Sequence, residues 1–364
     1  MLSIIIPVYK NKNIVEYCLS NVIRWLPPDS EVIVVDDASD HETSEVISRH
    51  KEIKVITHEE NMGNTIAYNT GAKHASGDIL IFIDSDIILF DESLFRIQQA
   101  FQRQEFDVVG TLLLYPYDNT IQHAGVAFDK WILSHIYIGR KQNEISFQDF
   151  EERQAVTAAF FACRREIFNV VGGFDETYRD GLEDIDFCLK CKEIGTKIWF
   201  SPKIHAYHLE SATRGAFKSI RRTYNYSIFF SKWSKKFEND LLIYFERDLI
   251  RKEVLKEIKR GEFTVINFCT TPNWCDLIEI IQRKNGRIGN VHNLSGFIPE
   301  FESIDLYRKL PIVFNKGSGS LLFIVDHFLQ LKSNFTWFQQ RQCTDIILDR
   351  HATAIKSSYW NNNI

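Results

Sequence analysis

The sequence predicts two α/β units, a larger doubly wound domain in the first two thirds of the chain and a smaller unit after it. In the larger unit, short continuous apolar runs alternate with segments of helical periodicity. This pattern is typical of parallel strands covered by helices on both faces of a sheet. The 364 residues, 45% of them hydrophobic and 25% charged, have the composition of a globular protein and are enough for two or three domains.

The elements of the larger unit follow in order along the chain. The expected strands are short apolar or β-branched runs, at 4–6, 31–35, 54–57 and 79–83. The expected helices have apolar residues at helical spacing, at 13–25, 40–50 and 61–75. Ligands of such sheets bind beyond the carboxyl ends of the strands. The residues that follow three of the runs are Pro7-Val8-Tyr9, Asp36-Asp37 and Asp84-Ser85-Asp86. Aspartate is also a common turn and N-cap residue, which explains one such position better than all of them together.

We place the larger domain at 1–236, a charge-rich helical connector at 237–260 and a small accessory α/β domain at 261–364. In the last of these we expect strands at 263–268 and 312–314 and helices at 274–283 and 320–331. About 100 residues suffice for a small domain. We expect this unit to recognise an acceptor or to associate with a second copy of the chain.

The stretch 214–236 has a distinct composition. It contains seven Lys or Arg, no Asp or Glu, and interleaved aromatic residues. A basic face with aromatic residues suits a membrane surface or an anionic lipid headgroup. The other interpretation is a solvated helix whose aromatic side chains pack on the first domain.

Several protein classes are excluded by composition. The formal charge of −5 argues against a protein that coats nucleic acid. No run approaches the roughly 18 apolar residues of a membrane-spanning helix, and the first residues lack the basic segment of a signal peptide. The seven scattered cysteines fit a reducing cytoplasm, and Cys188 and Cys191 lack the second pair that a zinc site needs. We therefore expect a cytoplasmic protein, with the inner face of the plasma membrane as an alternative location.

Seven motifs over more than half of the chain occur in an order that identifies a family. They lie at 3–9, 34–39, 61–63 with Asn69, 84–86, 172–176, 183–186 and 208–211 with Arg214 and Gly215. In these motifs, residues 3 to about 215 resemble the family 2 glycosyltransferases, which have the GT-A fold. The segments 121–125 and 208–215 are most similar to enzymes that build bacterial surface polysaccharides. The resemblance implies transfer of a sugar from a nucleotide-sugar to a glycan or lipid-linked glycan.

The resemblance also implies a divalent metal, Mn²⁺ or Mg²⁺. A departing diphosphate needs a cation, and carboxylates on a short loop hold hard metals while leaving positions open for phosphate. By the resemblance Asp86 binds the metal directly, and Asp84 faces the ribose or the metal's water shell. His208 is the third ligand by the same analogy, although His205 lies only three residues earlier. A structural histidine is the alternative interpretation of His208.

An acceptor hydroxyl needs a general base. Glu183 and Asp184 open an expected helix, whose N-terminus stabilises negative charge. The family's base is the aspartate of this acidic pair, so Asp184 is the candidate and Glu183 the reserve, while Asp186 is expected to orient its neighbours. By the family's mechanism one base opposite the leaving group implies inversion at the anomeric carbon. The alternative is an N-capping acidic cluster on an exposed helix.

The resemblance supplies the remaining site residues. Those expected at the nucleotide are Pro7, Val8, Tyr9, Asp37, Asn61, Gly63, Asp84 and Arg214. Asp37 can accept the imide N–H of uracil, which favours a UDP-sugar, but thymine offers the same edge. The residues expected near donor or acceptor sugar are His123, Gly173 and Phe174, of which Phe174 suits core packing equally well. Lys10 departs from the family, which often has Asn there, and we expect it to solvate the loop.

Two other functions are compatible with a doubly wound sheet that carries paired acids. A nucleotidyltransferase needs a glycine-rich phosphate loop after its first strand, and residues 7–12 contain no glycine. A non-catalytic protein that binds nucleotide-sugars or glycans is the second alternative, and the complete set of acidic residues argues against it.

Overall fold

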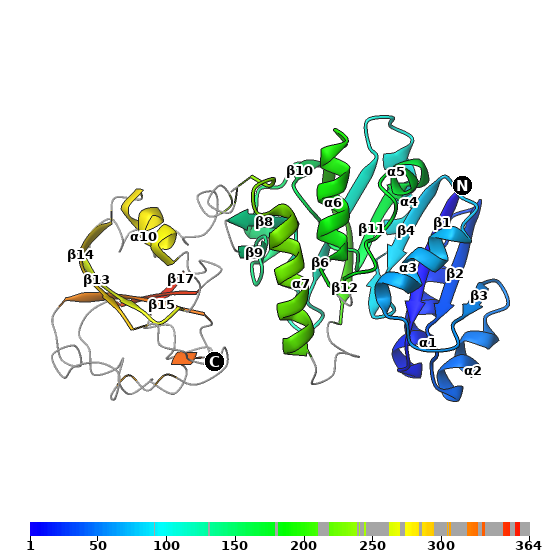
Figure 1. The fold of residues 1–364 in the computed structure, drawn as a ribbon, viewed down its shortest axis with the longest axis horizontal. Helices are drawn as coiled ribbons and strands as arrows, with labels where there is room; N and C mark the ends of the chain where they lie inside the picture. The colour runs from blue at the N-terminus through cyan, green and yellow to red at the C-terminus, as the bar shows by residue number, and fades with distance from the viewer. Residues whose placement is uncertain are drawn as a thin grey trace. The chain divides into compact units, whose positions relative to one another are not determined.

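The computed structural model describes residues 1–90, 92–129, 132–178, 181–209, 218–238, 240, 244, 262–269, 274–283, 286–294, 304, 306, 319–326, 330–331, 345–349 and 354–356. These residues fall into two compact units, each shown in Figure 1. The larger unit contains Met1–Phe128 and His135–Glu238, and the smaller one contains Asp129–Ser134 and Asn239–Ile364.

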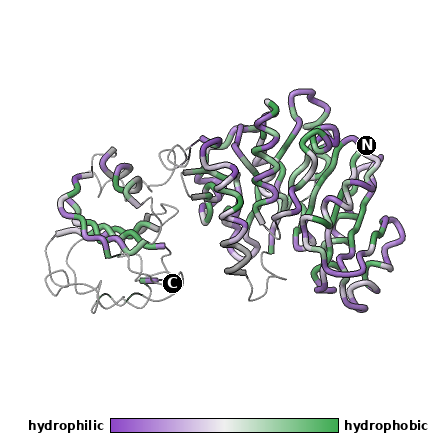
Figure 2. The backbone as a smooth tube through the Cα atoms, in the orientation of Figure 1, coloured by the Kyte–Doolittle hydropathy of each residue, from purple (hydrophilic) through white to green (hydrophobic). Residues whose placement is uncertain are grey.

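The larger unit is built on a mixed sheet of ten described strands in the order β10-β12-β6-β11-β4-β1-β2-β3, with β5 beside β12 and β7 beside β6. The strands are β1 (Leu2–Val8), β2 (Ser30–Asp36), β3 (Lys54–Thr57), β4 (Ile79–Ile83), β5 (Ile87–Leu89), β6 (Val108–Leu114), β7 (Ile121–His123), β10 (Glu151–Arg153), β11 (Phe160–Arg164) and β12 (Ile198–His208). Strands β4, β1, β2 and β3 are mutually parallel, as predicted, whereas β11 runs antiparallel to β4 and β6. The predicted α/β class is confirmed, and the strands appear mainly in the hydrophobic colour of Figure 2.

Helices cover both faces of this sheet. They are α1 (Lys12–Arg24), α2 (His41–Arg49), α3 (Asn64–Lys73), α4 (Ser93–Phe101), α5 (Arg165–Val170), α6 (Glu183–Glu193) and α7 (Lys218–Trp233). Side chains alternate between the two faces of a strand, so Ile4 and Ile6 share one core cluster with Val15 of α1. Ile5 faces the opposite side, where α3 packs so closely that a Cβ on Gly71 would lie 2.3 Å from Ile5 Cγ2. Gly71 is therefore required by packing.

A cluster of phenylalanine rings lies on the α3 side of the sheet. Phe82 of β4 stacks on Phe161 of β11 at a centroid distance of 5.1 Å and meets Phe174 edge-on, also at 5.1 Å. Phe168 of α5 and Phe187 of α6 complete the cluster. Buried aromatic pairs of this kind add about 0.5–1.5 kcal/mol each beyond their buried area. The cluster thus fixes the start of α6 against the sheet.

The smaller unit has a five-stranded sheet in the order β14-β13-β15-β16-β17. Its described elements are β13 (Glu262–Asn267), α10 (Trp274–Arg283), β14 (Arg287–Asn293), β15 (Ser320–Val325), β16 (Ile346–Asp349) and β17 (Ala354–Lys356). The first four strands of this order are parallel and β17 is antiparallel to β16. A separate two-stranded sheet consists of β8 (Val126–Asp129) and β9 (Ile132–His135). None of the helices in the described part of the chain is long and apolar enough to cross a membrane.

The structure corrects one predicted element of the smaller unit. The helix expected at 320–331 is wrong, because Ser320–Val325 forms strand β15 between β13 and β16. The run Leu321–Val325 is buried throughout, so it has no polar face that a surface helix would need. The helix expected at 274–283 is confirmed as α10. The strand expected at 312–314 lies outside the described residues.

Candidate active site

Two aspartates and one histidine meet at the carboxyl end of β4. Asp84 and Asp86 follow this strand directly, and His208 ends β12. The pairing of His208 with Ile87 brings β12 alongside the aspartate loop. One ligand atom of each of the three residues lies within 4.8 Å of the others, and His208 Nε2 is 3.2 Å from Asp86 Oδ1. His205 is turned instead against the ring of Phe90, with 4.5 Å between centroids.

Two carboxylates and an imidazole form a donor set that fits a divalent cation. Carboxylate oxygens suit both Mg²⁺ and Mn²⁺. An imidazole nitrogen is a softer donor than oxygen and favours the transition metal of the two. His208 is 8% exposed, the Asp86 side chain is 15% exposed and Asp84 is half-buried, so solvent and phosphate oxygens have access to the group.

Asp84 is oriented by two residues of α3 that the sequence analysis does not identify. The Tyr68 hydroxyl donates to Asp84 Oδ1 at 2.6 Å, and Asn64 Nδ2 donates to the same oxygen at 3.1 Å. Burial, reinforced by the adjacent carboxylate, raises the pKa of Tyr68 well above its ordinary value, so the phenol keeps the proton it donates. Asn64 and Tyr68 are four residues apart and therefore share one face of the helix.

The acidic pair lies in the first turn of α6, which begins at Glu183. Asp184 Oδ2 accepts a hydrogen bond from the amide of Ala158 at 3.0 Å, and Oδ1 accepts one from Ile185 N at 2.8 Å. Tyr68 Oη, which donates its one hydrogen to Asp84, also lies 3.2 Å from the carbonyl oxygen of the same Ala158. The main chain of Ala158 therefore connects the candidate base with the aspartate loop.

The two acids of this pair have different surroundings. Glu183 is 5% exposed, and its carboxylate accepts a hydrogen bond from the Gly181 amide at 2.7 Å. Burial, together with the charge of Asp184, raises the pKa of Glu183 to about 8. Burial also raises the pKa of Asp184, but the amides of Ala158 and Ile185 oppose this shift. Near neutral pH a shared proton is therefore held by Glu183, and the half-buried Asp184 carries the negative charge.

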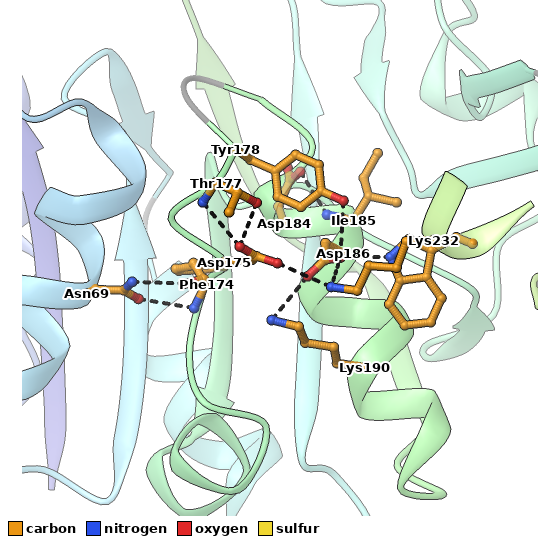
Figure 3. A network of polar contacts seen from close by, with 11 residues as sticks. Asn69, Phe174, Asp175, Thr177, Tyr178, Asp184, Ile185, Asp186, Lys190 and Lys232 are labelled. Carbon is orange, nitrogen blue, oxygen red and sulfur yellow. Dashed lines mark hydrogen bonds and ion pairs between the residues drawn. The ribbon is translucent and has the colours of Figure 1, made fainter. Parts of the chain in front are cut away.

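A second network fixes α6 to α7 and is drawn in Figure 3. Asp186 is completely buried, and its carboxylate lies 3.1 Å from Lys190 Nζ and 2.7 Å from Lys232 Nζ. Trp233 Nε1 donates to Asp186 Oδ1 at 2.7 Å, and Tyr178 Oη does so at 3.3 Å. A buried carboxylate is tolerated because cations and donors surround it. Asp186 thus holds the helix that carries the acidic pair.

The buried aromatic residues of α7 bear on the two interpretations of 214–236. Phe229 and Trp233 are at most 1% exposed and Phe230 is 8% exposed, whereas Tyr224 is 61% exposed. Asn225, also buried, donates to the carbonyl of Gly181 at 2.8 Å. These contacts support aromatic packing on the larger unit for this part of the stretch.

Asp37, which is predicted at the nucleotide site, holds the loop before α3 through hydrogen bonds. Asp37 Oδ1 accepts the Met62 amide at 2.8 Å and lies 2.7 Å from His58 Nδ1, and Oδ2 accepts the Gly63 amide at 2.8 Å. Asp37 is 3% exposed. Its contacts place Gly63, which has a φ of 91°, at the start of α3. A surface hollow beside this loop is lined by Glu60, Asn61, Met62, Gly63, Thr65, Ile66, Glu176 and Tyr178.

The predicted residues of the first strand differ in accessibility. Pro7 and Val8 are buried within β1, and Tyr9 after them is half-buried. Lys10 is exposed, lies 5.0 Å above the Tyr9 ring and donates its amide to Ser39 Oγ at 2.9 Å. Tyr9 is therefore the side chain of the three that can contact a ligand directly. Arg214 lies outside the described residues.

The residues expected on the sugar side are engaged by the protein itself. His123 is 1% exposed, with Nε2 accepting the Thr157 amide at 3.2 Å and Nδ1 lying 2.8 Å from His135 Nδ1. Burial lowers the pKa of His123 well below its ordinary value, so the ring is neutral. Phe174 is buried in the ring cluster, and a Cβ on Gly173 would lie 3.0 Å from Asn69 Oδ1. The core-packing alternative for Phe174 therefore fits its position.

Comparisons with known proteins give the site a family context. The sequence model of the family described as glycosyl transferase family 2 matches residues 3–172. The O-antigen biosynthesis protein RfbC of Myxococcus xanthus is 34% identical over 155 residues, which are 41% of this chain and 12% of that protein. An uncharacterized glycosyltransferase of Haemophilus influenzae is 29% identical over 52% of this chain and 61% of its own length. The chain thus spans less than two thirds of the length of either relative.

A solved structure shows the same fold. The crystal structure of GalNAc-T7 with UDP, GalNAc and Mn²⁺ superposes with a TM-score of 0.53 and 16% sequence identity, over 79% of this chain and 55% of that one. At this identity the likeness concerns the fold alone. It agrees with the GT-A architecture expected from the order of the sequence motifs.

Proposed function

Because residues 3–172 belong to glycosyl transferase family 2, we propose that this protein transfers a sugar from a nucleotide-sugar to a hydroxyl of a glycan or lipid-linked glycan. The observation that carries the proposal is the meeting of Asp84, Asp86 and His208 within 4.8 Å, joined to Asp184 through the main chain of Ala158. A surface-polysaccharide acceptor is supported by the similarity to the O-antigen biosynthesis protein of Myxococcus xanthus.

In this proposal Asp86 and His208 hold Mn²⁺, with Mg²⁺ as the alternative, and Asp84 completes the group. The cation would neutralise the charge that develops on the departing diphosphate. Tyr68 and Asn64 keep one oxygen of Asp84 occupied, which directs the other oxygen toward the cation or the ribose. Mn²⁺ is also the ion bound to the GalNAc-T7 structure of the same fold.

Asp184 is the proposed general base. It carries the negative charge of the acidic pair and is more accessible than Glu183. An ionised carboxylate can remove the proton from an acceptor hydroxyl while that hydroxyl attacks the anomeric carbon. With one base and no covalent intermediate, the displacement inverts the anomeric configuration.

The proposed donor is a UDP-sugar, with a dTDP-sugar as the alternative. Asp37, Asn61, Gly63 and Tyr9 gather at the carboxyl ends of β1 and β2, where nucleotides bind in doubly wound sheets. Because Asp37 already accepts two amides, its proposed role is to shape the loop that receives the base as well as to accept the imide hydrogen. The smaller unit is proposed to bind the acceptor or a second copy of the chain.

The test is nucleotide release from a panel of UDP- and dTDP-sugars, with Mn²⁺, with Mg²⁺ and with chelator. Wild-type protein should hydrolyse one donor slowly and only with metal, and Asp86→Ala should abolish this release. The same proteins are titrated with UDP and Mn²⁺ by calorimetry. Absence of UDP binding by the wild type would refute the uridine donor, and absence of any nucleotide or metal binding would refute the enzyme.

A further inference from the structure

Gln122 of β7 contacts the candidate metal ligand His208 through both ends of its side-chain amide. Its Oε1 lies 2.6 Å from His208 Nδ1, and its Nε2 lies 3.2 Å from the main-chain oxygen of His208. Gln122 is 6% exposed and His208 is 8% exposed, so water competes little for these bonds. Gln122 has no role in the site as derived above.

The second contact determines the orientation of the amide. A main-chain carbonyl oxygen can only accept a hydrogen bond, so the amide group that faces it must be the NH₂. The carbonyl oxygen of Gln122 therefore faces the imidazole, and His208 Nδ1 must carry the hydrogen that this oxygen accepts. The other ring nitrogen, Nε2, is the one directed to Asp86 Oδ1, at 3.2 Å. The contacts of Gln122 thus select the ring nitrogen that can bind a cation.

We propose that Gln122 is a positioning residue that holds His208 with Nε2 toward the metal. The inference rests on the proposed function, because it assumes that Asp84, Asp86 and His208 bind a divalent cation. A hydrogen-bond acceptor behind a metal-binding histidine fixes its ring orientation and tautomer, and its loss typically lowers metal affinity by 10- to 100-fold. The main-chain bond to His208 adds a restraint on the end of β12 itself.

The experiment measures Mn²⁺ affinity of the full chain by electron paramagnetic resonance, without donor or acceptor. Gln122→Leu keeps the approximate volume but removes both hydrogen bonds, and it should weaken Mn²⁺ binding about 10- to 100-fold. Gln122→Glu keeps an acceptor for the Nδ1 hydrogen and should recover part of this loss. Should Gln122→Leu fail to fold, Gln122→Asn makes the same comparison, because its amide is one methylene shorter and cannot reach both partners.

Gln154→Leu is the matched control. Gln154 is also buried, at 5% exposure, and its amide also contacts one residue twice, donating to Glu238 O at 2.7 Å and accepting from Glu238 N at 2.9 Å. It should lose stability in urea as Gln122→Leu does, but bind Mn²⁺ like the wild type. If Gln122 had only a structural role, Gln122→Leu and Gln154→Leu would bind Mn²⁺ with the same affinity.

The outcomes separate this inference from the proposed function. If the wild type binds Mn²⁺, Asp86→Ala does not, and folded Gln122→Leu binds as the wild type does, the role of Gln122 is refuted while the metal site stands. If the wild type binds no Mn²⁺ and releases no nucleotide, the proposed function fails and this inference fails with it. Equal loss of affinity in Gln154→Leu would also overturn it.

Discussion

Glu183 and Asp184, the two residues of the acidic pair, differ in protonation state because their carboxyl groups have different surroundings. Glu183 is buried, whereas Asp184 is half-buried and receives the amides of Ala158 and Ile185. Amide donors stabilise a carboxylate, and burial favours the neutral acid. The helix N-terminus adds a favourable field for one negative charge in the first turn. Adjacent positions in the sequence thus have different protonation states.

Asp184→Asn should lower the rate of sugar transfer by about 10²- to 10⁴-fold, the usual contribution of a general base. The amide side chain is similar in size and can still accept one of the two main-chain hydrogen bonds. Mn²⁺ and UDP affinities should therefore stay close to those of the wild type. Steady-state kinetics and calorimetry on the same preparations provide the check. Near-normal turnover in this variant would move the base to another residue.

The stability of the protein should depend on pH through Glu183. Its pKa is raised from 4.5 to about 8 in the folded protein, so the folded state binds this proton more tightly than the unfolded chain does. The contribution of this proton to the free energy of unfolding is complete below about pH 4.5 and is lost as the pH rises toward 8. Urea unfolding in chelator should show the wild type losing stability relative to Glu183→Gln over this range. A constant difference between the two proteins would contradict the raised pKa.

Sequence alone identifies some residues of the site and misses others. Asp84 and Asp86 are found from their position after an apolar strand, and His208 and Asp184 from the motifs that carry the family resemblance. Tyr68, which orients Asp84, is an ordinary helical residue whose role depends on which face of α3 meets the sheet.

Three other residues show the same limit. Gln122 lies inside a recognised motif, yet its importance follows from its two contacts with His208 at the end of β12 rather than from its residue type. Phe174 is in a motif but belongs to the ring cluster. His58 is in no motif and still holds Asp37.

At the scale of elements, the contact between α6 and α7 depends on a buried charge. Asp186 receives two lysines and the indole N–H of Trp233, and Lys232 also lies 3.2 Å from Asp175 in the preceding loop. Removing one partner of a buried charge is costly because the remaining charge stays desolvated. The orientation of α6, and with it the acidic pair, should therefore be sensitive to substitutions on α7.

Trp233→Phe should lower the free energy of unfolding by about 1.5–3 kcal/mol, the range for a hydrogen bond to a charged group. Phenylalanine keeps much of the ring but has no donor for Asp186. Trp199→Phe is the control for lost ring volume, because Trp199 Nε1 has no hydrogen-bond partner among the described residues. Urea unfolding should show the smaller effect for Trp199→Phe. Equal effects would mean that packing alone accounts for the loss.

The strand β15 shows why some elements cannot be predicted from local pattern. Its run Leu321–Val325 is apolar at every position, and a continuous apolar run fits a buried strand and a buried helix equally. What decides between them is pairing with β13 and β16, residues that are far apart in the sequence. The strands predicted at 31–35 and 54–57 are confirmed. Both runs consist mostly of β-branched residues, which favour a strand over a helix.

For the whole molecule, the two units have separate hydrophobic cores. One core is built from strands and helices of the larger unit, with Ile4, Ile81 and Phe160 among its members. The other contains Ile266 and Phe323 of the smaller sheet. The pattern of alternating strands and helices predicts both units, because each sheet and its helices repeat the same local periodicities. Their exact boundaries in the chain stay a prediction.

Separate cores predict two thermal transitions, of which Mn²⁺ should shift only one. A ligand that binds the native state stabilises the unit that contains its site, by about 2.7 kcal/mol at a concentration 100 times its Kd. Asp84, Asp86 and His208 all lie in the larger unit, so its transition should move to higher temperature with Mn²⁺ and return with chelator. Scanning calorimetry of the wild type and of Asp86→Ala measures this, and the variant should show no shift. A single transition that moves as a whole would mean that the two cores unfold cooperatively, in which case the metal site stabilises the smaller unit as well.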